Sequence, residues 1–156
     1  LACQVPESSV HAFEINDKRR ALCKRVANLN GVRDRLQFHG GCDVDNLSSI
    51  ILGDKELLVI DCEGCEIDLL SPDIKTNLKN IDILVELHDD RSGGPTTAET
   101  LCQRFRPTHE ITVINTQQRN KDNYPELHGI KNFAGKYLLK EGRVYSRGWL
   151  YLSVKQ

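Results

Sequence analysis

The sequence lacks the features that define several classes of protein. No apolar run approaches the roughly 20 residues that a membrane-spanning helix requires, so we expect no membrane partner. Positive charge is not in excess, because 21 Lys and Arg stand against 22 Asp and Glu. That balance argues against a nucleic-acid partner bound through its phosphates. Met is absent, even at position 1, and we therefore expect the chain to be a piece of a longer protein.

The length of 156 residues indicates one domain that is large enough to bury a core. Of the six cysteines, Cys23, Cys62 and Cys102 fall in or beside regular elements, unlike the cysteines of small, loop-rich disulfide scaffolds. We therefore predict reduced thiols and a cytoplasmic location. The spacing Cys62-x-x-Cys65 is found in zinc sites and redox pairs. No second paired motif accompanies it, so we predict neither a disulfide nor zinc there.

Strand and helix patterns alternate along most of the chain. The alternation predicts an α/β protein, a three-layer sandwich with a mostly parallel sheet, and the strand-rich end predicts an antiparallel strand at one edge. The expected strands are 10–15, 36–39, 57–61, 83–87, 110–115, 137–139 and 149–154. The expected helices are 17–29, 45–52, 66–80 with an interruption near Ser71-Pro72, and 97–105. Residues 116–135 are predicted to form a long loop.

The stretch 57–66, LLVIDCEGCE, is the most informative part of the sequence. Its four apolar residues predict a strand buried on both faces. Ligands bind at the carboxyl ends of the strands in such sheets, where Asp61 and Glu63 fall. His88 follows the next strand, so we expect it near Asp61, and an imidazole suits a general base at neutral pH. Helix capping by Asp61 and a structural His88 are the alternative interpretations.

Four segments resemble the class I, Rossmann-like S-adenosylmethionine-dependent methyltransferases, and most closely their FkbM type. The segments are VHAFEIN (10–16), ALCKRVANLNGVRDRLQFHGGC (21–42), LLVIDCEGCEIDLL (57–70) and ILVELHD (83–89). The string Asp-x-Glu-Gly-x-Glu at 61–66 is the most specific part. The resemblance implies a Rossmann-like fold, S-adenosylmethionine as cofactor, and methyl transfer to an oxygen of a small molecule, sugar or secondary metabolite.

The resemblance also implies roles for particular residues. Glu14 would accept the ribose hydroxyls of the cofactor and Ile15 would flank its adenine, although a solvated strand-end acid and a core residue are the alternatives. The other implied cofactor contacts are Gly41, Cys42, Asp43 and Asp61, and the implied catalytic residues are Glu63, His88 and Asp61. Methyl transfer by one in-line displacement requires no metal, so we expect none, although the residues allow a divalent ion at Asp61 that polarises a vicinal diol.

One departure from the family is large. In the family, a first strand and a glycine-rich loop precede the strand that carries the ribose-binding Glu. Here only LACQVPESS precedes Val10, and it holds no glycine. We therefore expect an N-terminally incomplete domain, with a gap or a foreign strand between the strands at 10–15 and 57–61. The rival hypotheses are a non-catalytic fragment or interaction domain and a redox or zinc domain built on Cys62 and Cys65.

Overall fold

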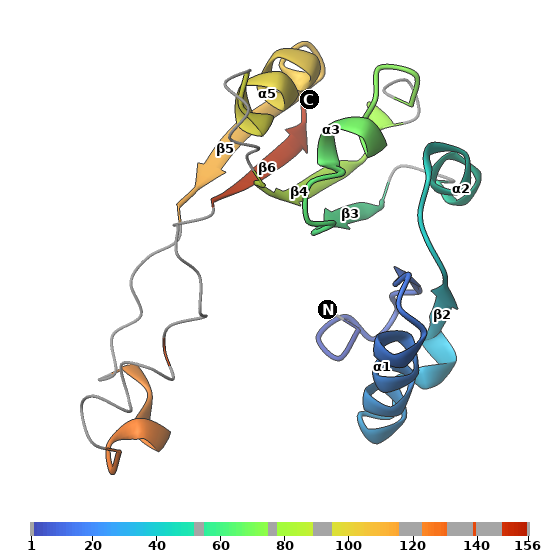
Figure 1. Cartoon of the computed structure of the whole chain (residues 1–156), viewed down its shortest axis with the longest axis vertical. Coiled ribbons are helices and arrows are strands. Elements are labelled where there is room, and N and C mark those ends of the chain that lie inside the picture. Colours follow the sequence, from blue (N-terminus) through green and yellow to red (C-terminus); the bar gives the residue numbers. More distant parts are fainter. Residues whose placement is uncertain are drawn as a thin grey trace. The chain divides into compact units, whose positions relative to one another are not determined.

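The computed structural model describes residues 2–51, 55–74, 78–88, 95–115, 123–130, 139 and 148–155. These residues form two compact units, Leu1–Leu52 and Gly53–Gln156 (Figure 1). Each unit is described below by itself. That the two units act as a single domain stays a prediction.

The first unit is a parallel β-α-β arrangement. Strand β1 (Val10–Phe13) pairs in parallel with β2 (Leu36–His39), and helix α1 (Asp17–Leu29) connects them. Asn16 caps α1, since its side chain accepts hydrogen bonds from the backbone N–H groups of the first turn. The 3₁₀ helix η1 (Arg33–Arg35) precedes β2, and helix α2 (Val44–Ile50) follows it.

The apolar stripe of α1 is largely exposed. Leu22, Val26 and Leu29 lie on one face, as their spacing predicts, yet their exposed fractions are 56%, 49% and 84%, and Ala27 is the buried residue of the helix. Two strands spaced about 4.8 Å apart form a sheet narrower than a helix of about 10 Å diameter. The two-stranded sheet therefore leaves most of this stripe uncovered.

The second unit contains a four-stranded sheet in the order β3-β4-β6-β5. Strand β3 is parallel to β4, and β6 is antiparallel to both β4 and β5. The predicted strand directions are confirmed within each unit, including the antiparallel last strand. The prediction that this last strand closes an edge of the sheet is wrong, because β6 lies between β4 and β5. The bounds are β3 (Leu57–Ile60), β4 (Asp82–Glu86), β5 (His109–Ile114) and β6 (Trp149–Val154).

Strands β1 and β3 belong to different sheets and do not pair with each other. The gap or foreign strand expected between the strands at 10–15 and 57–61 stays a prediction.

One face of the second sheet forms the core of its unit. Ile83, Val85, Leu150 and Leu152 are fully buried on it. Helices α3 (Glu66–Leu69) and α5 (Thr97–Phe105) pack against each other, and Arg104 of α5 donates hydrogen bonds to backbone carbonyls at the end of α3. A capping box at Thr96 fixes the start of α5 where the sequence predicted it.

The opposite face of β3 is exposed, which corrects the prediction of burial on both faces. Leu57 and Val59 are 47% and 43% exposed, whereas Ile60, which points the other way, is 3% exposed. Successive strand residues point to opposite faces, and the described helices that pack on this sheet, α3 and α5, belong to the buried face. The continuous apolar run therefore does not correspond to burial on both sides.

Some sequence predictions fall in part outside the described residues. Helix α3 ends at Leu69, just before the interruption predicted near Ser71-Pro72, and Leu78 is again helical, while residues 75–77 lie outside the described part of the chain. The strand predicted at 137–139 lies almost wholly outside the described residues, and so does much of the loop predicted at 116–135. The described part of that loop, residues 123–130, contains the 3₁₀ helix η3 (Pro125–Leu127). No helix among the described residues is both long and apolar enough to span a membrane.

Candidate functional site

Asp61, Glu63 and His88 come together at the carboxyl ends of β3 and β4. Asp61 directly follows β3, and His88 follows β4 after one intervening residue. Nε2 of His88 lies 3.6 Å from Oδ1 of Asp61 and 3.3 Å from Oε2 of Glu63. The predicted closeness of His88 and Asp61 is confirmed, because their strands are parallel neighbours and end at the same edge of the sheet.

A tight turn closed by a disulfide positions Glu63. Glu63 and Gly64 both have positive φ angles, 56° and 114°, which fold the chain back on itself. The Cα atoms of Cys62 and Cys65 are therefore 5.6 Å apart, within the range of about 4.4–6.8 Å that a disulfide needs, and the two residues are bonded. The prediction of reduced thiols is wrong at this pair, whereas the described residues Cys3, Cys23, Cys42 and Cys102 are free.

The left-handed conformation of Glu63 is costly for a residue with a side chain. It disfavours a non-glycine residue by about 1–2 kcal/mol, and such outliers cluster at functional sites. The side chain of Glu63 is 70% exposed and is directed at His88, not at a packed core. The turn therefore holds a carboxylate at the strand edge despite an unfavourable backbone conformation.

Glu66 is a member of the site that sequence analysis did not assign. It lies in the first turn of α3 and is 1% exposed. Its Oε1 atom lies 2.6 Å from Nδ1 of His88 and accepts a hydrogen bond from the backbone N–H of Gly64. The only sequence signal was its place as the last acid of the Asp-x-Glu-Gly-x-Glu string.

The contact with Glu66 fixes how His88 is presented to the other acids. A carboxylate accepts hydrogen bonds, so we assign the imidazole proton to Nδ1. The lone pair of Nε2 then faces Asp61 and Glu63, and this atom has no hydrogen-bond partner among the described residues. The side chain of His88 is only 7% exposed. Nε2 of His88 and one carboxyl oxygen each of Asp61 and Glu63 thus converge at the strand edge.

Burial raises the pKa of Asp61, and a hydrogen bond to the carboxyl of Glu86 raises that pKa further. Glu86 is 1% exposed at the end of β4. Asp61, Glu63 and Glu66 therefore lie against the imidazole of His88, and Glu86 lies against Asp61. The local charge is strongly negative when these acids are ionised.

The predicted ribose and adenine contacts lie at the carboxyl ends of β1 and β2 in the first unit. Glu14 directly follows β1, and its Oε1 accepts a hydrogen bond of 2.7 Å from the backbone N–H of Asn16. Ile15 is 81% exposed. Its side chain lies beside Gly41. A Cβ atom added at Gly41 would be in van der Waals contact with Cδ1 of Ile15, at 3.8 Å. Within this unit the structure thus brings Ile15 and Gly41 together.

Asp43 has a structural role in addition to the predicted one. Its side chain caps α2 by accepting a hydrogen bond of 2.7 Å from the backbone N–H of Asn46. This bond lowers the pKa of Asp43. Cys42 is half-buried, and burial raises the pKa of its thiol, with the charge of Asp43 adding to the effect. Neither observation tests the predicted adenine contacts, which stay predictions.

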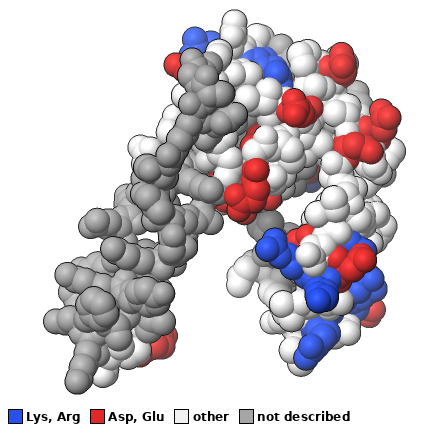
Figure 2. All heavy atoms as spheres, viewed as in Figure 1, with Lys and Arg blue, Asp and Glu red and all other residues white. Residues whose placement is uncertain are grey.

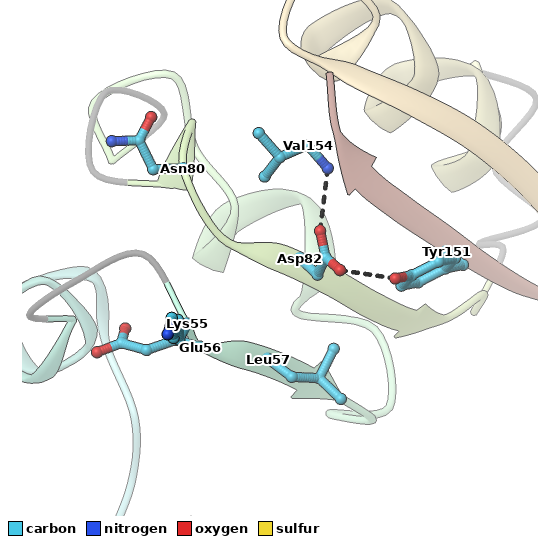
Figure 3. Close-up of a pocket in the computed structure, with 7 residues that line it drawn as sticks. All are labelled: Lys55, Glu56, Leu57, Asn80, Asp82, Tyr151 and Val154. Carbon is cyan, nitrogen blue, oxygen red and sulfur yellow. Dashed lines mark hydrogen bonds between the residues drawn. The ribbon is translucent and has the colours of Figure 1, made fainter. Parts of the chain in front are cut away.

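Each unit has one other surface feature. Lys and Arg side chains gather over α1 in Figure 2, where Lys18, Arg19, Lys24 and Arg25 are exposed. A hollow of about 620 Å³ lies at the amino ends of β3 and β4, next to Asp82 (Figure 3). It is at the opposite end of the parallel strands from the cluster of Asp61, Glu63 and His88.

Comparison with known proteins establishes a fold. No protein-family model matches the sequence, and no curated protein matches it. The chain is similar to the solved structure of cofactor-bound Rv0187 from MTB, with a TM-score of 0.55 and 16% identity over 97% of this chain and 63% of that one. It is similar to the StiE O-MT, with a TM-score of 0.53 and 11% identity over 99% of this chain and 62% of that one. It is also similar to the [4+2]-cyclase SpnF, with a TM-score of 0.51 and 13% identity over 99% of this chain and 69% of that one.

The chain therefore has the α/β, Rossmann-like fold of class I methyltransferases, as the sequence predicted. At these identities the likeness concerns the fold alone. The chain spans between 62% and 69% of the length of these three structures. One of the three is a cyclase, so the fold by itself does not specify methyl transfer.

Proposed function

We propose that the chain is part of an S-adenosylmethionine-dependent methyltransferase of the FkbM type that methylates an oxygen of a small molecule, sugar or secondary metabolite. The observation that carries the proposal is the convergence of Asp61, Glu63 and His88 at adjacent strand ends. It occurs in a fold that is shared with an O-MT. The carboxyl ends of parallel strands are where such folds bind their ligands.

The first unit fits the adenosine portion of the cofactor. The hydrogen bond from Asn16 orients the carboxylate of Glu14 at the end of β1, where an acid can accept both ribose hydroxyls. The exposed side chain of Ile15, next to Gly41, offers an apolar surface for a flat base. Cys42 and Asp43 complete the proposed adenine side.

The second unit fits a proton acceptor for the hydroxyl that is methylated. When bound, the cofactor supplies an activated methyl group on its sulfonium. Nε2 of His88 is free to take the hydroxyl proton, and Glu66 stabilises the resulting imidazolium through Nδ1. Glu63 and Asp61 are the alternative bases at the same edge. The deprotonated oxygen is then the nucleophile, and orientation of the two reactants contributes several kcal/mol.

Isothermal calorimetry with S-adenosylhomocysteine on the whole protein tests the proposal. We expect binding, and we expect Glu14→Gln to weaken it by at least about tenfold, since each lost charge-assisted hydrogen bond is worth about 1.5–3 kcal/mol. Glu7→Gln, an exposed acid in the same unit, is the matched control and should leave the affinity unchanged. An unchanged affinity in Glu14→Gln would remove the ribose role, and absence of binding by the whole protein would support a non-catalytic domain instead.

Turnover distinguishes the base from the cofactor contacts. Replacing His88 or Glu63 by Ala should lower kcat by about 10²-fold or more for the residue that acts as the base, with little change in cofactor affinity. Full activity after loss of both side chains would exclude both as the base. Glu14→Gln should show the opposite pattern, a weaker cofactor affinity.

The disulfide supports a second candidate, a thiol–disulfide exchange domain. Cys62-x-x-Cys65 follows a strand and ends at a helix start, and Cys65 is exposed. Thiolates in exchange proteins are stabilised by positive surroundings, whereas Glu63 and Glu66 flank this pair. Catalysis of insulin reduction by dithiothreitol would support this candidate, and a rate equal to the uncatalysed one would exclude it.

The cellular location stays a prediction. The proposed cytoplasmic location was inferred from reduced thiols, and the Cys62–Cys65 disulfide removes part of that basis. The small-molecule acceptor and the expected lack of nucleic-acid and membrane partners likewise remain proposals from the sequence.

A further inference from the structure

The cluster at the ends of β3 and β4 combines three side chains that commonly ligate metals. Asp61, Glu63 and His88 each offer one ligating atom, and these atoms all lie within 4.8 Å of one another. We propose that Asp61, Glu63 and His88 bind a divalent first-row transition-metal cation. The proposed site stands on this geometry and does not depend on methyl transfer.

The spacing of the three atoms matches donors that share one ion. Two donors that each lie about 2.1 Å from an ion are about 3.0 Å apart at a right angle and about 3.4 Å apart at a tetrahedral angle. Nε2 of His88 is 3.3 Å from Glu63 and 3.6 Å from Asp61. Small rotations of the two exposed carboxylates are sufficient to complete the geometry.

His88 points to a ligand independently of the acids. Its side chain is 93% buried, since 7% is exposed, and Nε2 has no hydrogen-bond partner within the described part of the chain. A buried polar atom without a partner costs about 1–3 kcal/mol. This atom moreover faces the carboxyl oxygens of Asp61 and Glu63. A cation placed between the three atoms would give Nε2 a partner.

Glu66 supplies the support that metal-binding histidines commonly have. Such a histidine donates its other ring N–H to a carboxylate or a carbonyl, which fixes its tautomer and orientation. Glu66 accepts from Nδ1 of His88 at 2.6 Å, and the backbone N–H of Gly64 holds the same carboxylate oxygen. Glu66 is therefore a positioning residue that directs Nε2 toward the proposed ion.

The donor set and the exposure indicate the class of ion. One imidazole nitrogen with two carboxylate oxygens suits Mn²⁺, Fe²⁺ or Zn²⁺ better than Mg²⁺ or Ca²⁺, which prefer oxygen ligands only. Asp61 and Glu63 are 46% and 70% exposed, so coordination positions remain for water or another oxygen ligand. If the proposed function also holds, a hydroxyl or vicinal diol of the acceptor would take these positions.

Binding of Mn²⁺ to the whole chain in its disulfide form, measured by the loss of the free-ion EPR signal, tests the site. Mn²⁺ binds thiols weakly, so it avoids confusion with the cysteines. We expect one ion per chain. Asp61→Asn and Glu63→Gln should each weaken Mn²⁺ binding by at least about tenfold. Loss of a residue that only orients a ligand, as Glu66 does, typically lowers metal affinity 10–100-fold, and Asp61 and Glu63 would contact the ion directly. Both side chains are exposed, so these variants should fold.

Asp73→Asn and Glu110→Gln are matched controls, since both are exposed acids of the same unit outside the cluster. They should keep the wild-type affinity. Equal Mn²⁺ affinity in all four variants would mean adventitious binding and would overturn the proposal, as would absence of binding by the wild-type chain at millimolar Mn²⁺. Calorimetry with S-adenosylhomocysteine in a metal-free buffer reports separately on the proposed function, so each proposal can fail without the other.

Discussion

Asp82 links β4 to β6, and its removal gives a sharp test of how this sheet is stabilised. Its Oδ2 accepts a hydrogen bond of 2.6 Å from the hydroxyl of Tyr151, and its Oδ1 accepts one of 3.0 Å from the backbone N–H of Val154 (Figure 3). Asp82→Ala removes both bonds. Hydrogen bonds to a charged group contribute about 1.5–3 kcal/mol each. Because the site is half-exposed and water can replace part of each bond, we expect a total loss of about 2–3 kcal/mol at neutral pH.

The same two bonds make the effect depend on pH. The hydrogen bond from Tyr151 lowers the pKa of Asp82, and the bond from Val154 lowers it further. A carboxyl whose pKa is lower in the folded state stabilises the protein above its unfolded pKa of about 3.9. That stabilisation is lost as the pH falls through the lower, folded pKa. The difference between wild type and Asp82→Ala should therefore shrink below about pH 4.

Urea unfolding followed by circular dichroism, at neutral pH and near pH 3, measures both quantities. Asp82→Asn retains the shape without the charge and should lose less than Asp82→Ala. Glu110→Ala, an exposed acid on β5, is the control and should change stability by less than about 0.5 kcal/mol. A cost below about 0.5 kcal/mol for Asp82→Ala at neutral pH would refute the reasoning. An equal cost at both pH values would show that the charge of Asp82 plays no part.

Two further predictions concern local structure. Thr96→Ala should destabilise the second unit by about 1 kcal/mol in urea unfolding, because it removes the side chain that caps α5. The control Thr112→Ala, at an exposed strand position, should lower the free energy of unfolding by less. Equal losses in the two variants would argue against the cap. Reducing the Cys62–Cys65 disulfide should lower the free energy of unfolding by about 2 kcal/mol, since the closed loop is short. Cys62→Ser should cost the same and should be insensitive to reductant, and a reductant effect that persists in Cys62→Ser would assign it to other residues.

Most of the fold could be predicted from the sequence because local patterns and topology agree. Apolar runs and caps located the strands at 57–60 and 149–154 and helix α5 within a residue or two. The strand-rich end predicted the antiparallel β6. Burial was harder to predict. The exposure of Leu57 and Val59 depends on which helices cover each face of the sheet, and a run of apolar residues does not reveal which face is covered.

The position of the candidate site could be predicted from the sequence, but the contacts among its residues could not. Parallel strands end at one edge, so Asp61 and His88 could be placed together before the structure was known. The contact between Glu66 and His88 depends on the sharp reversal of the backbone at Glu63 and Gly64, which brings the carboxylate of Glu66 to the imidazole. The same reversal brings Cys62 to Cys65. A non-glycine residue with positive φ is rarely assumed from sequence, which is why both features were missed.

The position of β6 between β4 and β5 has a consequence for synthesis on the ribosome. Among the described strands β5 pairs with β6 alone, yet β6 follows it in the chain after the whole segment 115–148. At about 5–20 residues per second, β5 waits on the order of seconds for its partner. Its backbone N–H and C=O groups stay open to other strands during that time. Exposed Val113 and Ile114 are at its end, so nascent chains that stall before Trp149 should depend on chaperones far more than complete ones.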